Sequence, residues 1–199
     1  TNGLSDTDVI PAIWRAMDTW NAVDSTHIPI VADGRFFGPI TPINFGVTQR
    51  SLGFGGFGVP IAEIFHAGFL PEEFFETVSP GVGTRILGVT FTYTFISGGQ
   101  PTDVNNDGRR DVAFREIYYN NYFSWAIDGN IDVETVVLHE AGHGLSQGHF
   151  GKLFRTDKNG KLHFAPRAVM NPSYSGVQQT LSGTDIAGHS SIWASWSRE

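Results

Sequence analysis

The 199-residue sequence predicts an α+β fold. Apolar residues recur with helical spacing in three segments, and β-branched and aromatic residues gather in three others. The expected helices cover residues 8–21, 132–146 and 182–196, and the expected strands cover residues 27–32, 86–96 and 112–119. Hydrophobic residues make up 40% of the chain, which is enough to build a buried core and excludes global disorder.

Each expected helix has a recognisable start. Asp8 is placed to cap the first helix, and Asp132 to cap a second helix that runs to about Ser146. Before the last helix, Ser182 and Asp185 form an S-x-x-D capping box. We therefore expect three helices whose first turns are fixed by side chains.

The strands and loops follow from local composition. Residues 86–96 read ILGVTFTYTFI and give the clearest strand. Residues 156–162 predict a hairpin that turns at Asn159-Gly160, a dipeptide that favours such turns. Residues 34–60 contain many glycines and prolines and predict a loop, either a plain surface loop anchored by phenylalanines or a flap over a cleft.

Composition and charge exclude several classes of protein. The chain has no cysteine, so disulfides, thiolate zinc sites, iron–sulfur clusters and a cysteine nucleophile are excluded. The formal net charge is −7, and we find no basic run and no cluster of Lys and Arg on one stretch, so we expect no nucleic-acid partner. No apolar run approaches the roughly 20 residues of a membrane span, so we expect no membrane partner.

The stretch H-E-A-G-H at 139–143 carries the clearest chemistry. On a helix, His139 and His143 lie one turn apart on the same face, where both imidazoles can bind one ion. A third histidine, His149, would face away on a continuous helix, so the helix must end before it, and we expect Gly148 to end it with a positive φ. Three neutral imidazoles with one open position indicate a catalytic zinc site, with Glu140 beside it as the base.

Two sequence patterns together resemble a known family. The pattern H-E-x-x-H-x-x-x-x-x-H resembles the metzincin metalloproteases, and A-V-M-N-P-S-Y at 168–174 resembles the Met-turn and the following wall of the matrixin branch. Residues 8–21, 87–90 and 181–193 are similar to the first helix, the edge strand and the last helix of matrixins. The resemblance therefore extends over most of the chain, as separate short segments.

The resemblance implies a single catalytic domain over residues 1–199 with a zincin fold. Residues 1–149 would form an upper lobe, with a twisted, mixed five-stranded sheet and two long helices, that ends at the third zinc ligand. Residues 150–199 would form a smaller lobe with the Met-turn and the terminal helix, and zinc would lie at the floor of the cleft between the lobes. The sequence departs from the family at Ser146, where a glycine is usual, and in its longer connection from His149 to Met170.

The resemblance also assigns roles. His139, His143 and His149 would bind one Zn²⁺, Glu140 would take the proton from a metal-activated water, and Met170 would form an apolar floor without binding the metal. The remaining assignments concern substrate: Leu87, Gly88 and Val89 would pair with an extended peptide, and Pro172 and Tyr174 would form the wall of a pocket. From the residues alone, Tyr174 is equally well explained as a packing aromatic, and the other four histidines are expected to be structural.

An acidic loop gives a second candidate metal site. Residues 103–111 read D-x-N-x-D-G-x-x-D, with oxygen ligands at alternate positions before a glycine turn, which suits a structural Ca²⁺. The candidate ligands are Asp103, Asn105, Asp107, the carbonyl of Arg109, and Asp111. A full EF-hand is not expected because Phe114 replaces its last glutamate. The alternative is a solvated turn without an ion.

We therefore expect a secreted, monomeric zinc endopeptidase that acts on protein or peptide substrates, with any signal or pro-segment outside this chain. Two other functions remain open: a calcium-stabilised binding module with a vestigial zinc site, and a zinc hydrolase of a non-peptide substrate. Thermolysin-type enzymes are disfavoured because they use a downstream glutamate where this chain has His149. Without cysteine, these residues cannot encode the thiolate latency of some matrixins.

Overall fold

The computed structural model describes residues 3–31, 46–56 and 62–195. In these residues it contains five α-helices and a mixed three-stranded sheet, which confirms the predicted α+β class. None of the helices described is both long and apolar enough to cross a membrane.

The chain forms two compact units. The first joins Thr1–Ala32 with Phe123–Glu199, and the second is Asp33–Tyr122. The lobe boundary expected at residue 149 lies inside the first unit, and the division into an upper and a lower lobe stays a prediction.

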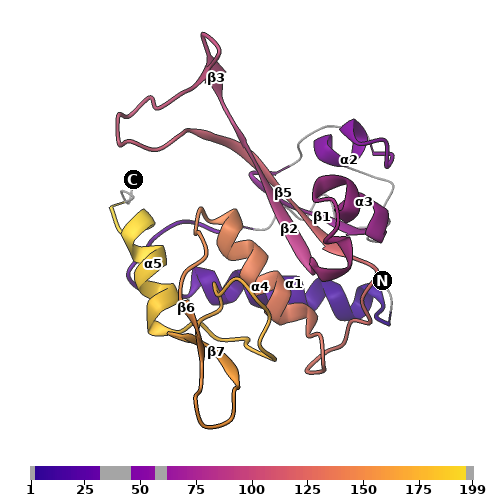
Figure 1. Cartoon of the computed structure of the whole chain (residues 1–199). Coiled ribbons are helices and arrows are strands. Elements are labelled where there is room, and N and C mark those ends of the chain that lie inside the picture. Colours follow the sequence, from indigo (N-terminus) through magenta and orange to yellow (C-terminus); the bar gives the residue numbers. More distant parts are fainter. Residues whose placement is uncertain (1–2, 32–45, 57–61, 196–199) are drawn as a thin grey trace. The chain divides into compact units, whose positions relative to one another are not determined.

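The first unit is mainly helical, with one β-hairpin (Figure 1). Its elements are helix α1 (Asp6–Asn21), helix α4 (Val133–Gly144), strands β6 (Lys152–Arg155) and β7 (Leu162–Ala165), and helix α5 (Gly183–Trp193). The hairpin expected at Asn159-Gly160 is confirmed, because β6 and β7 pair antiparallel on either side of it. Trp196, expected in the last helix, lies outside the described residues.

Helix α1 packs against α4 through buried and partly buried contacts. The indole N–H of Trp20 donates to the carbonyl of Leu138 at 2.9 Å, and Arg15 pairs with Glu134 at 2.6 Å. The N-cap of α1 is Ser5 rather than Asp8, which corrects the prediction. Asp8 is instead the third helical residue, and its carboxylate accepts the N–H of Ser5 in a capping box. The N-cap therefore lies three residues earlier than expected.

The second unit contains the main sheet. Its elements are helix α2 (Val47–Ser51), strand β1 (Ile64–Leu70), helix α3 (Glu72–Val78), the 3₁₀ turn η2 (Gly83–Arg85), and strands β2 (Gly88–Thr94), β3 (Ile96–Ser97), β4 (Gln100–Pro101) and β5 (Val112–Asn120). The strand order is β1-β5-β2, with β1 parallel and β2 antiparallel to the central β5. Among the described strands, β2 therefore lies at an edge of its sheet, as expected.

The expected five-stranded sheet is not what the described residues form. They contribute three strands to the main sheet, and the segment expected as a strand at 27–32 is irregular over residues 27–31. Pro29 explains the difference, because it has no N–H to donate to a ladder, and the N–H of Ile30 bonds locally to Ile28 at 3.0 Å.

An aromatic core fills the second unit. Phe74 and Phe75 of α3 are fully buried with Tyr118 of β5. Phe54 packs edge-on against Phe74, with ring centroids 5.4 Å apart. One phenylalanine of the Gly/Pro-rich segment is thus an anchor, as expected. The prediction of a loop throughout this segment is wrong at Val47–Ser51, which form helix α2. The remainder of that segment, at 34–45 and 57–60, lies outside the described residues.

Candidate metal centre

Three imidazole nitrogens converge in the first unit. The Nε2 atoms of His139 and His143, both on α4, are 3.2 Å apart, and Nε2 of His149 lies 3.1 Å and 3.0 Å from them. A tetrahedral zinc ion bound at about 2.0–2.1 Å requires nitrogens about 3.3 Å apart. The three histidines are therefore close enough to bind one metal ion.

The outer nitrogens of two rings fix which atom faces the centre. Nδ1 of His139 lies 2.7 Å from the carbonyl oxygen of Val169, and Nδ1 of His143 lies 2.7 Å from that of Gln147. A carbonyl oxygen only accepts, so each Nδ1 carries the hydrogen and each neutral ring presents a lone pair on Nε2. This is the tautomer that a metal site needs.

Burial favours the neutral form of these rings. It lowers the pKa of all three histidines below the ordinary value, although the carbonyl of Val169 and the carboxylate of Asp185 partly oppose this at His139. Repulsion from His139 in its protonated form further lowers the pKa of His143 and His149. Nitrogen lone pairs that face one another are stabilised by a shared cation, so the donor set fits a divalent metal.

The end of α4 brings His149 close to His139 and His143. The N–H of Ser146 donates to the carbonyl of His143 at 3.0 Å, and that of Gln147 to Gly142 at 2.9 Å, which is a Schellman ending. Ser146 has φ 71°, the left-handed conformation that glycine usually supplies. The expectation that Gly148 would make this turn is wrong, because Gly148 is not left-handed.

Met170 lies in a turn that packs against α4. The turn is closed by a bond of 3.3 Å from Asn171 N–H to Ala168 O, and Met170 is fully buried. A side chain at Gly142, which lies between His139 and His143, would overlap the Met170 sulfur and approach Trp20 to 3.0 Å. Glycine is therefore required there for Met170 to approach. The role of Met170 as a floor beneath the ion stays a prediction.

Asp185 stabilises the turn at Val169 and Met170, a role that the sequence did not reveal. Its buried carboxylate accepts the N–H groups of Val169 and Met170, both at 3.0 Å, and that of Ser182 at 2.8 Å. The expected capping box is thus confirmed, and the same carboxylate also holds the turn whose Val169 carbonyl orients His139. The S-x-x-D pattern signalled the cap, but no local pattern could signal the turn.

Glu140 lies on α4 between the two helical ligands. It is 5% exposed, and its negative charge raises the pKa of His143 against the larger effect of burial. This location agrees with the place expected for a catalytic base, a role that stays a prediction.

Tyr174 is hydrogen-bonded to the N-cap of α4. Its hydroxyl oxygen accepts the N–H of Asp132 at 3.0 Å, and burial raises the pKa of that hydroxyl. The Asp132 carboxylate in turn caps α4 by accepting from Thr135 N–H at 2.8 Å, as predicted. The N–H of Gln178 donates to the Thr135 hydroxyl, so the segment after the Met170 turn is fixed at two points to the start of α4.

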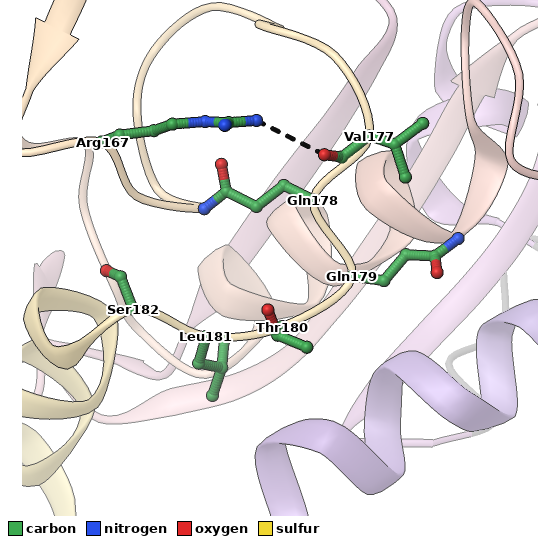
Figure 2. Close-up of a pocket in the computed structure, with 7 residues that line it drawn as sticks. All are labelled: Arg167, Val177, Gln178, Gln179, Thr180, Leu181 and Ser182. Atoms are coloured by element: carbon green, nitrogen blue, oxygen red, sulfur yellow. Dashed lines mark hydrogen bonds between the residues drawn. The ribbon is translucent and has the colours of Figure 1, made fainter.

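A shallow hollow lies beside this segment (Figure 2). Its volume is about 310 Å³, and it is lined by Arg167, Val177, Gln178, Gln179, Thr180, Leu181 and Ser182. Arg167 donates to the Val177 carbonyl at 3.4 Å across it. Pro172 and Tyr174, expected to form a pocket wall, are not among the lining residues.

The expected peptide-binding strand belongs to the second unit. Gly88 and Val89 begin the edge strand β2, and the carbonyl of Leu87 accepts the N–H of Asn120 at 2.8 Å. Because Pro172 and Tyr174 belong to the first unit, a joint role of all five residues in substrate binding stays a prediction.

The acidic loop satisfies its carboxylates locally. Asp103 accepts the N–H groups of Asp107 and Gly108 at 3.0 and 2.9 Å, and Asp111 accepts that of Val104 at 3.0 Å. Within residues 3–31, 46–56 and 62–195, the three histidines form a group close enough to share an ion, and the carboxylates of this loop do not. Calcium binding by Asp103, Asn105, Asp107, Arg109 and Asp111 stays a prediction.

Comparison of the sequence with protein-family models and with curated proteins finds no match to either. The likeness to metzincins therefore rests on the motifs of this chain.

Proposed function

We propose that this protein is a zinc-dependent endopeptidase of the metzincin type, similar to matrixins. The observation that carries the proposal is the convergence of three Nε2 atoms, from an H-E-x-x-H helix and the histidine that follows it, within 3.0–3.2 Å of one another.

Zinc suits this set of ligands better than other metals. All three are neutral imidazoles, and two of them are oriented through Nδ1 by backbone carbonyls. Three protein ligands leave a tetrahedral ion with an open position, which is the arrangement of catalytic zinc sites. When bound, zinc polarises a substrate carbonyl and makes a nearby water more acidic.

The chain supplies the proton transfers and the positioning. Glu140 accepts a proton from the attacking water and passes it to the leaving amine. The Val169 and Gln147 carbonyls hold His139 and His143, and Asp185 holds the turn that carries Val169. Each supporting group is a main-chain atom or a buried side chain, so the ligands are fixed before any ion arrives.

Peptides are the proposed substrates. An extended peptide would add along the edge of β2 and the residue before it, at Leu87, Gly88 and Val89. In the other unit, Pro172 and Tyr174 are proposed to form the wall of a side-chain pocket. We further propose a secreted monomer stabilised by calcium at the acidic loop.

The decisive test compares the unmodified chain with Glu140→Ala. Zinc content, measured by mass spectrometry, should stay near one ion per chain in both, whereas cleavage of denatured casein should fall by at least about a thousandfold in the variant. His149→Ala, as a second variant, should lose the zinc as well as the activity.

The same assay separates the alternatives. Zinc binding without casein cleavage by the unmodified chain would contradict the proposal and favour a binding module. Hydrolysis of small esters without casein cleavage would favour a zinc hydrolase of non-peptide substrates.

A further inference from the structure

The hairpin formed by β6 and β7 is almost completely exposed. Seven of its eight strand residues are exposed, and the hairpin extends beyond the helices of its own unit (Figure 1). Leu153, Phe154 and Leu162 are 54%, 47% and 59% exposed. Large apolar side chains gathered on one exposed element indicate an interaction surface.

The hairpin is also basic, although the chain as a whole carries a net charge of −7. Residues 152–167 contain five of the thirteen Lys and Arg residues and one acid, Asp157. The five cations are Lys152, Arg155, Lys158, Lys161 and Arg167. They are spaced apart in the sequence, which is why no basic run is visible there. The paired strands and their turn carry four of them, and Arg167 follows β7.

Strand β6 combines charged and apolar side chains in a regular order. It reads K-L-F-R, with a cation at each end and two apolar residues between them. The ladder places Leu153 opposite Phe164 on one face and Phe154 opposite His163 on the other. A two-stranded ladder leaves the outer edge of each strand open to a further strand.

We propose that β6 is a docking strand for an extended segment of the polypeptide substrate in which acidic residues flank apolar ones. This inference rests on the proposed endopeptidase function and names a class of substrate for it. The acids would meet Lys152 and Arg155, and the apolar residues would meet Leu153 and Phe154. Main-chain hydrogen bonds would supply the remaining affinity.

The position and chemistry of the hairpin favour a peptide substrate over other anionic partners. The hairpin connects the third metal ligand, His149, to the turn of Met170. A substrate docked on it is therefore bound to a segment that joins two parts of the proposed metal centre. A polypeptide offers carboxylates, apolar side chains and main-chain groups at the two-residue period of a strand. A nucleic acid or a lipid headgroup layer does not offer this period.

The test measures binding and cleavage separately. In the Glu140→Ala background, which prevents cleavage, a fluorescent peptide with the pattern Glu-Leu-Val-Glu is titrated by anisotropy. The double variant Lys152→Gln/Arg155→Gln should bind it about tenfold more weakly. The matched double variant Arg50→Gln/Arg85→Gln, which changes two exposed cations of the second unit and the net charge equally, should bind within about twofold of the parent.

Cleavage then tests the substrate assignment. With Glu140 restored, the β6 double variant should lose about tenfold in kcat/KM on a long acid-flanked substrate and nothing on a short neutral peptide. Peptide binding that depends on β6, in a chain that cleaves neither substrate, would support the docking strand and overturn the endopeptidase proposal.

Three results would overturn the docking strand itself. One is an equal loss of peptide affinity in the two double variants. Another is tighter, β6-dependent binding of single-stranded DNA or of phosphatidylserine vesicles. The third is self-association of the chain that Lys152→Gln/Arg155→Gln abolishes.

Discussion

Helix α4 with its following turn, and the acidic loop at 103–111, were both predicted to bind a metal ion, yet they use their polar groups in opposite ways. On α4, backbone carbonyls accept hydrogen bonds from Nδ1 of His139 and His143, and the Nε2 atoms of both rings face one point. In the acidic loop, Asp103 and Asp111 accept N–H groups of the same loop.

The difference teaches that ligand spacing is only half of a metal site. The other half is a set of neighbours that orient each ligand and leave its binding atom uncommitted. At α4 one of those neighbours is local, Gln147, and others come from distant parts of the chain, such as Val169 and Asp185. In the acidic loop, Asp103 and Asp111 already accept N–H groups of the same loop, so we expect its site to be weaker.

The largest predicted effect comes from removing Asp185. Asp185→Ala leaves the N–H groups of Val169, Met170 and Ser182 without their acceptor, which should cost about 3–5 kcal/mol in the free energy of unfolding. The loosened turn should also weaken zinc binding about 10–100-fold. Urea unfolding of the metal-free chain and zinc titration against a chelating dye measure the two effects.

Asp185→Asn serves as the control for that change, because its amide oxygen can still accept one or two of these bonds. Its losses should be smaller than those of Asp185→Ala in both measurements. Unchanged zinc affinity in Asp185→Ala would show that the support of His139 does not pass through this turn.

A smaller loss is predicted for Gly142→Ala. The added methyl group would overlap the Met170 sulfur and crowd Trp20 at 3.0 Å, so the packing between α4 and the Met170 turn should be destabilised by about 1–3 kcal/mol. Gly142→Ala combined with Met170→Ala, which removes the overlapping side chain, should lose less stability than the two separate changes added together. Additive losses would mean that Gly142 and Met170 do not compete for the same space.

At the end of α4, one substitution is predicted to increase the stability of the chain. Ser146 is held at φ 71°, so Ser146→Gly should stabilise the chain by about 1 kcal/mol, measured as a rise in melting temperature. The matched change Gly148→Ala should be tolerated, because Gly148 is not left-handed and no atom lies within 4 Å of the position that its Cβ would take. Destabilisation by Ser146→Gly would contradict the assignment of the turn to this residue.

These examples show what the sequence could and could not predict. The histidine ligands were visible because a helix converts the spacing of His139 and His143 directly into proximity. The end of the same helix was predicted at the wrong residue, since serine adopts a left-handed conformation only when the bonds around it require one. Asp185 was recognised as a cap but not as the support of the Met170 turn, because that contact depends on tertiary packing.

The same reason separates the predicted strands. Most of the segment at 86–96 became β2, with its end at 96–97 in β3, and the segment at 112–119 became β5. Their β-branched and aromatic residues suit a strand ladder. The segment at 27–31 has similar residues but includes Pro29, and its local bond between Ile30 and Ile28 replaces a ladder bond. A single residue without an N–H outweighed the composition of its neighbours.

The last prediction concerns the acidic loop. If calcium binds there, saturating calcium should raise the melting temperature of the zinc-loaded chain by a few degrees, because an ion that binds only the folded state stabilises it by about 1–3 kcal/mol when in large excess. Asp107→Ala should abolish this rise. It should cost at most about 1 kcal/mol without calcium, because its bond of 2.8 Å from Arg109 N–H is exposed to solvent. A melt that calcium leaves unchanged would identify the loop as a self-satisfied turn and would restrict metal binding to the region of α4.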